Sequence, residues 1–203
     1  SMLSSVDINR YAHQLLEARA LSEQLPPLTA TAAISAEDAY QITHRILALR
    51  SARGERLVGH KIGFSNRKVW QCFGIDEALH RPIWAPLFES TVRYAPDNSG
   101  VQSLTGAVQP RIEPGVVFGV GKTPPPDADL DALADCIGWI AHGIEVAVCP
   151  YQGWKFNEAD AIAAFGLHGT LIIGQRQHLN KVARHNLADL LSAASVSLSC
   201  SGD

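Results

Sequence analysis

The first part of the chain, up to residue 55, repeats its apolar side chains with the period of an amphipathic helix. One such segment ends at Pro26-Pro27, because proline cannot continue a helix. A second begins at Ser35, which stands three residues before Asp38 as in a helix-capping box, and ends at Gly54. The apolar positions of these two predicted helices are Tyr11, Leu15, Leu16 and Leu21, followed by Ala39, Ile42, Ile46 and Leu49.

Beyond residue 55 the pattern changes to short apolar runs separated by glycine and proline, which is typical of strands and turns. The runs predict strands over 56–64, 107–120, 143–148, 170–174 and 196–200. The remaining segments predict helices over 66–73, 129–142 and 158–164, and a loop over 75–90. A helical N-terminal segment followed by mixed β structure indicates an α+β or barrel-like fold.

Composition and charge narrow the classes of function. The 203 residues fit one large domain, or one domain with a small appendage. A net charge of −3 argues against a nucleic-acid-binding protein, which normally carries a basic surface. No apolar run reaches the length of a membrane span, and charged residues interrupt the N-terminal segment where a signal peptide would be apolar. We therefore expect a cytoplasmic protein that binds neither nucleic acid nor membrane.

Two carboxylates, Glu113 and Glu145, interrupt apolar runs that are predicted to be strands. A carboxylate is costly to bury unless a cation or hydrogen bonds compensate its charge. Two of them indicate a divalent metal site with oxygen ligands. The alternative is a pair of solvated carboxylates at the strand ends.

Lys61 lies in a short apolar run between Gly59 and Gly63. Glycines in a strand permit the close approach of another backbone or of a ligand. A half-buried lysine at this place is either an anchor for an anionic substrate or a proton-transfer group. The alternative is that its ammonium reaches the surface while its stem covers apolar neighbours.

Several stretches together carry a family resemblance, among them 36–40, 59–64, 109–115 and 143–146. They resemble the 2-keto-4-pentenoate hydratase / 4-oxalocrotonate decarboxylase branch of the fumarylacetoacetate hydrolase superfamily. The resemblance implies an α+β fold, a fumarylacetoacetate-hydrolase-like mixed β-roll or barrel with an N-terminal helical segment. We expect residues 1–55 to form that segment and 56–203 to form a catalytic-type domain without the family's last strands.

The resemblance also implies a set of site residues. Glu113 and Glu145 match two carboxylates that hold Mg²⁺ or Mn²⁺ in the family, and Gly115 stands where the third is found, so we expect weak metal binding. Lys61 matches the family's glycine-flanked lysine and is expected to be catalytic. His168 lies in a run, 163–169, that departs from the Asp-Asn-Ala-Ser run common in the family, and it could supply acid/base chemistry there, although a lone histidine in an apolar run is often structural. Lys61 is also expected to bind substrate, together with Leu87 and Phe88.

The function implied is that of a hydratase in aromatic catabolism. It would act on a small 2-hydroxy-dienoate or 2-oxo acid through a metal-stabilised enolate. One alternative is a 4-oxalocrotonate-type decarboxylase, and another is a noncatalytic member or partner subunit, because Gly115 replaces a metal ligand. The implied partners are the small 2-oxo acid and further copies of the chain in a homo-oligomer, or a related decarboxylase or hydratase.

Overall fold

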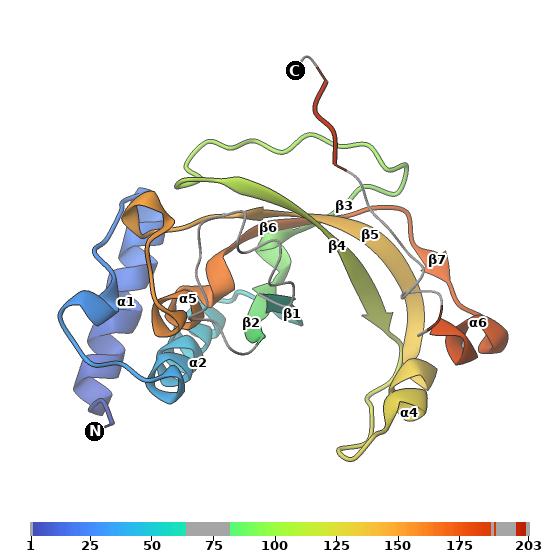
Figure 1. The fold of residues 1–203 in the computed structure, drawn as a ribbon, viewed down its shortest axis with the longest axis horizontal. Helices are drawn as coiled ribbons and strands as arrows, with labels where there is room; N and C mark the ends of the chain where they lie inside the picture. The colour runs from blue at the N-terminus through green and yellow to red at the C-terminus, as the bar shows by residue number, and fades with distance from the viewer. Residues whose placement is uncertain (1, 64–81, 188, 190–197, 202–203) are drawn as a thin grey trace. The chain divides into compact units, whose positions relative to one another are not determined.

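Two helices form in the N-terminal segment, as the apolar pattern predicts, but the first ends at Leu21 and not at the predicted Pro26-Pro27 (Figure 1). The computed structural model describes residues 2–63, 82–187, 189 and 198–201. Helix α1 covers Ser5–Leu21, and the side chain of Ser4 accepts a hydrogen bond from the Asp7 amide at its start. Helix α2 covers Ala36–Ala52 and begins with the predicted capping box between Ser35 and Asp38, which confirms the sequence pattern.

The remaining elements are short helices and strands that follow one another along the chain. The further helices are η1 (Leu28–Ala30), η2 (Glu89–Thr91), α4 (Leu130–Asp135), η3 (Gln152–Trp154), α5 (Glu158–Ala163), η4 (Phe165–Leu167) and α6 (Lys181–His185). The strands are β1 (Leu57–Gly63), β2 (Ile83–Phe88), β3 (Val92–Tyr94), β4 (Arg111–Val120), β5 (Ile137–Ala147), β6 (His168–Ile173) and β7 (Gln177–His178).

The strands form two sheets. Strands β1 and β2 pair antiparallel, with Lys61 opposite Ala85. The second sheet has the order β3-β6-β5-β4, and β7 pairs with β5. Strands β4 and β5, which carry Glu113 and Glu145, are therefore neighbours in one sheet.

Two predicted elements differ from the structure. The helix predicted over 129–142 is wrong beyond Asp135, where β5 begins, and the loop predicted over 75–90 contains strand β2. In β4, Gly119 has no side chain to block Trp139 of β5, since a Cβ at 119 would lie 1.9 Å from the Trp139 ring. Sheet pairing thus overrides the helical spacing of the apolar residues in 137–140.

Other predictions at this level fall wholly or partly outside the described residues. The short helix predicted over 66–73 lies outside them. Of the strand predicted over 196–200, residues 198–200 are described and are not in a strand, so that part of the prediction is wrong. None of the helices in the described part of the chain is long and apolar enough to cross a lipid bilayer.

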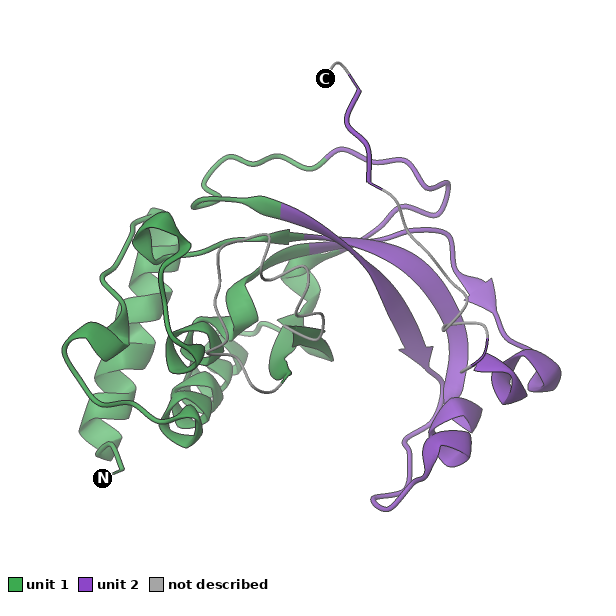
Figure 2. Ribbon diagram, in the orientation of Figure 1, with its two compact units in different colours: residues 1–92, 102–111, 146–170 green, residues 93–101, 112–145, 171–203 purple. Residues whose placement is uncertain are grey.

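The chain divides into two compact units (Figure 2). Unit 1 comprises residues 1–92, 102–111 and 146–170, and unit 2 comprises 93–101, 112–145 and 171–203. The main hydrophobic core lies in unit 1, where α1, α2 and α5 contribute buried side chains such as Ile42, Ile46 and Ile162. The predicted domain division at residue 55 stays a prediction, and residue 55 lies within unit 1.

Candidate functional site

Glu113 and Glu145 lie on the neighbouring strands β4 and β5 of unit 2. Both residues are intermediate between buried and exposed, and each has an interaction partner. Carboxylate oxygens are the ligands that Mg²⁺ and Ca²⁺ prefer in proteins. The two strands therefore bring the oxygen donors of the predicted metal site into one sheet.

Gly115 follows Glu113 by two residues on the same strand. It is exposed, and a Cβ added to it would meet no atom within 4 Å. Within the described ranges, no group of three or more His, Cys, Asp or Glu side chains could hold a metal ion. Two carboxylates would leave most coordination positions of a divalent cation to water, so metal binding by Glu113 and Glu145 stays a prediction. The open space at position 115 would accept one more side chain.

Lys61 is held in unit 1 by the segment that precedes β6. Its Nζ donates a hydrogen bond of 3.0 Å to the carbonyl oxygen of Gly166. Gly63 leaves room for the lysine stem, since a Cβ at 63 would lie 3.3 Å from Lys61 Cε. The glycine that flanks Lys61 in the sequence is thus explained by close packing against the lysine itself.

The segment that receives Lys61 has an unusual backbone. Phe165, Gly166 and Leu167 all have positive φ angles, of 58°, 58° and 63°. The left-handed region costs roughly 1–2 kcal/mol for each residue that carries a Cβ, so the surrounding structure must hold this turn in place. The apolar pattern of this segment did not predict the turn, although Gly166 was a possible signal.

His168 begins β6 and is buried, with 3% of its surface exposed. Its Nε2 lies 2.9 Å from the Thr91 hydroxyl, which donates its own proton to the Phe88 carbonyl oxygen at 3.1 Å. We therefore assign Nε2 as the donor to Thr91, because a hydroxyl has one proton to give. These contacts fix the imidazole ring, and the catalytic role of His168 stays a prediction.

The predicted substrate-binding residues on β2 are buried in unit 1. Leu87 is 6% exposed and Phe88 1% exposed. The Phe88 ring packs 6.3 Å from the Phe165 ring, and the Arg50 guanidinium lies 4.1 Å from its centroid. The Phe88 side chain therefore packs against the left-handed turn, and the contact of Leu87 and Phe88 with substrate stays a prediction.

Gln109, at the start of the motif that contains Glu113, has a role that sequence analysis missed. Its side-chain Nε2 donates to the carbonyl oxygens of Cys149 and Tyr151, at 3.0 and 2.7 Å. Its Oε1 accepts a hydrogen bond of 2.8 Å from the Gly153 amide. The glutamine thus ties the segment before β4 to the segment after β5 within unit 1.

No protein-family model matches the chain, whereas individual relatives do. It is 30% identical over 177 residues to a 2-hydroxypent-2,4-dienoate hydratase of Pseudomonas putida, a match that covers 83% of the chain and 74% of the relative. It is also 30% identical over 173 residues to a 4-oxalocrotonate decarboxylase of Pseudomonas sp, which covers 82% of the chain and 62% of that protein. The chain thus spans about two thirds of the length of these relatives.

Among solved structures, the chain resembles a 4-oxalocrotonate decarboxylase from Pseudomonas putida G7 that is complexed with magnesium and adipate. The TM-score is 0.75 at 20% sequence identity, and the match covers 85% of the chain and 64% of the decarboxylase. Similarity at this identity shows a shared fold. It confirms the α+β class that the sequence predicts.

Proposed function

Since this chain belongs to the family of dienoate hydratases and 4-oxalocrotonate decarboxylases, which have the fumarylacetoacetate-hydrolase-like fold, we propose that it is a lyase that hydrates a small 2-hydroxy-dienoate. The observation that carries the proposal is the match to the dienoate hydratase. Because this match covers 83% of the chain, it must include the central strands β4 and β5. These strands carry the two carboxylates of the candidate site.

Glu113 and Glu145 would hold a divalent cation, Mg²⁺ or Mn²⁺. The magnesium of the similar decarboxylase structure supports this assignment. When bound, the cation supplies Lewis-acid stabilisation of negative charge on the substrate oxygens. The proposal includes weak binding, because a glycine at 115 leaves a coordination position to water.

Lys61 and His168 supply the proposed protein groups of the reaction. The ammonium of Lys61, oriented by its bond to the Gly166 carbonyl, would pair with the carboxylate of the substrate. His168, whose ring is fixed through Thr91, would move a proton as the dienol becomes a conjugated ketone and water adds to it. Leu87 and Phe88 would shape the apolar side of the substrate site. The product is a 4-hydroxy-2-oxo acid, one water heavier than the substrate.

The test is turnover of 2-hydroxypent-2,4-dienoate by the chain with added Mg²⁺ or Mn²⁺, followed by loss of the dienoate absorbance and by NMR of the product. We expect Glu113→Gln and Glu145→Gln to lose at least tenfold in kcat/KM. Glu17→Gln, an exposed position on α1, is the matched control and should keep full activity. Absence of turnover at saturating metal would contradict the proposal and favour a noncatalytic member of the family.

A second candidate activity is decarboxylation, because a 4-oxalocrotonate decarboxylase is equally similar in sequence. Both reactions stabilise negative charge on the same 2-oxo group, so the site residues do not distinguish them. The two reactions give different products, and product analysis therefore separates them. Release of CO₂ from 4-oxalocrotonate, with no hydration of the dienoate, would assign the chain to the decarboxylases. Sedimentation of the chain alone and with a related hydratase or decarboxylase tests the expected oligomer and partner.

A further inference from the structure

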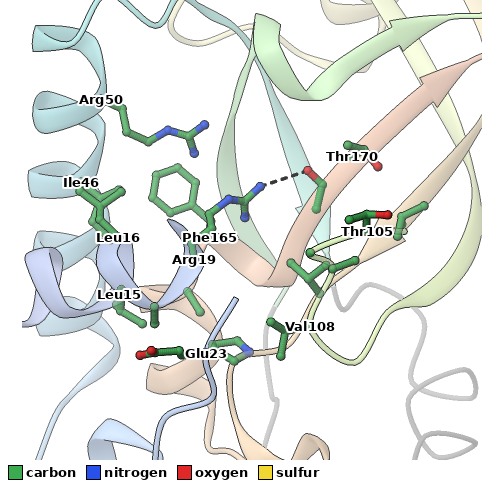
Figure 3. A pocket seen from close by; sticks show the side chains of 18 of the residues that line it. Leu15, Leu16, Arg19, Glu23, Ile46, Arg50, Thr105, Val108, Phe165 and Thr170 are labelled. Atoms are coloured by element: carbon green, nitrogen blue, oxygen red, sulfur yellow. Dashed lines mark hydrogen bonds between the residues drawn. The ribbon is translucent and has the colours of Figure 1, made fainter. Parts of the chain in front are cut away.

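Unit 1 contains a cavity of about 260 Å³ that none of the predicted site residues lines (Figure 3). Side chains of α1 and α2, the segment 102–108 and the segments around β5 and β6 surround it. All of its lining residues belong to unit 1. Because no side chain proposed for the lyase reaction lines it, the cavity is a second candidate site.

Arg19 of α1 presents a guanidinium to this cavity. It donates hydrogen bonds of 2.8 and 3.2 Å to the carbonyl oxygens of His168 and Gly169. A guanidinium has five N–H donors, so further donors remain after these two bonds. In the part of the chain that the structure describes, no carboxylate lies within the 4.0 Å of an ion pair with Arg19. In the described part of the chain, its close partners are thus carbonyl oxygens, and the charge of Glu55 acts on it from a longer distance.

The surroundings of Arg19 combine burial with access. Protein atoms enclose its guanidinium on most sides, and this burial, with the nearby charge of Arg50, lowers the pKa of Arg19 to about 10. The residue nevertheless keeps more than a third of its surface accessible, and that surface includes the cavity wall. At neutral pH the group remains a cation. A partly desolvated cation that faces an open cavity favours an anionic ligand.

The other charged residues of the cavity do not take this role from Arg19. Arg50 is committed to Glu55 by two hydrogen bonds of 3.0 and 2.8 Å, and its guanidinium stacks 5.5 Å from the Phe165 ring. Glu23 lies well apart from the Arg19 guanidinium in Figure 3. The site therefore has one cationic anchor with donors to spare.

The rest of the wall is largely apolar. Leu15, Leu16, Ile46, Val108 and Phe165 line the space around the anchor. A pocket of this kind orients a ligand by one polar contact and gains affinity from apolar area. We propose that the cavity binds a small monocarboxylic acid, whose carboxylate pairs with Arg19 and whose apolar body packs against these walls.

The experiment uses benzoate as the probe and isothermal titration of the full chain in EDTA, so that the metal site does not contribute. We expect saturable binding by the wild type and at least tenfold weaker binding of benzamide, which has the same shape without the charge. Arg19→Gln should weaken benzoate binding at least tenfold. The benzoate affinity of Arg19→Lys should lie between those of the wild type and Arg19→Gln. Arg10→Gln, on the exposed side of α1 and paired with Asp7, is the matched control and should bind as the wild type does.

Two further variants keep the test decisive. Leu16→Trp fills the cavity from a partly buried position and should abolish binding while Arg19 is retained, which also covers the case that Arg19→Gln fails to fold. The double variant Glu113→Gln/Glu145→Gln should bind benzoate normally, so loss of the proposed lyase activity leaves this site intact. Equal affinity for benzoate and benzamide, or no saturable binding, would overturn the proposal.

Discussion

At the scale of single residues, Gly115 is the position where the proposed metal site is incomplete. Residues 113 and 115 point to the same face of β4, because side chains alternate along a strand. A side chain at 115 meets open space, so the fold should accept one. We predict that Gly115→Glu raises the affinity for Mn²⁺ by about tenfold or more, as an added carboxylate replaces water. Titration followed by the EPR signal of free Mn²⁺ measures the change.

The matched control for this substitution is Val116→Glu. It adds the same charge to the same strand, but on the opposite face, at a position that is already 43% exposed. We expect its Mn²⁺ affinity to stay within about twofold of the wild type, since exposed charges at a distance are screened. An equal gain in both variants would mean that net charge, and not the position of the ligand, determines binding.

Glu55 gives a residue-scale prediction for stability and pH. The side-chain hydrogen bonds from Arg50 hold the pKa of the Glu55 carboxyl below its usual value of 4.5. A carboxyl with a lowered folded pKa stabilises the fold above its unfolded pKa, and the contribution is lost as pH falls through the folded pKa. We predict that Glu55→Gln lowers the free energy of unfolding by about 1–2 kcal/mol at neutral pH. The difference should shrink once the pH falls below 4.5.

Urea denaturation of both proteins across this pH range measures the effect. Arg53→Gln is the control, because Arg53 is 58% exposed and its Nη2 lies 3.6 Å from Glu55. Its cost should stay below about 0.5 kcal/mol, as for other exposed ion pairs. A Glu55→Gln difference that persists unchanged at acid pH would show that the carboxylate charge is not what stabilises the fold.

At the scale of elements, the side chain of Gln109 joins the segment before β4 to the segment after β5 within unit 1. Replacing it with alanine removes three hydrogen bonds and leaves the carbonyls of Cys149 and Tyr151 without that partner. We predict that Gln109→Ala lowers the free energy of unfolding by about 2–4 kcal/mol, as measured by urea denaturation. The exposed Gln175→Ala should change it by less than about 0.5 kcal/mol. Similar values for both would refute the bridging role.

Local signals predicted the start of α2 well, because the capping box at Ser35 acts within a few residues of its own position. The end of α1 was predicted less well, since the helix stops at Leu21, before Pro26. Local signals failed where a distant partner decides the structure. The apolar residues in 137–140 fit a helix by spacing, yet they pair with β4, where Gly119 makes room for Trp139. Predictors that read one segment at a time have no access to this complementarity.

The residues of the two candidate sites also differ in how far the sequence alone could reveal them. Glu113, Glu145 and Lys61 stood out in the sequence because a charge inside an apolar run is unusual. Arg19 did not, since a charged residue on an amphipathic helix is ordinary. Its interest arises only when α1 packs so that the guanidinium reaches the carbonyl oxygens of His168 and Gly169.

At the scale of the whole molecule, the two units differ in how much apolar surface they bury. The main core, with large side chains such as Ile42 and Ile162, belongs to unit 1. In unit 2, β4 leaves Ile112 and Phe118 48% and 40% exposed. Segments with few buried apolar contacts open locally at a lower free energy than a packed core does. The backbone amides of the strands that carry the carboxylates should therefore be less protected against hydrogen exchange than those of the helices of unit 1.

Hydrogen–deuterium exchange with mass spectrometry tests this difference and its link to function. We predict that amides of α2 and α5 exchange at least about tenfold more slowly than those of β4. Addition of Mn²⁺ with oxalate, a mimic of the substrate's 2-oxo acid group, should slow exchange in β4 and β5 and leave α2 unchanged, because a ligand stabilises the segments that hold it. The Glu113→Gln/Glu145→Gln variant should lose this protection. Protection that appears in α2 alone, or that survives in the double variant, would place the ligand away from these strands and remove both carboxylates from the metal site.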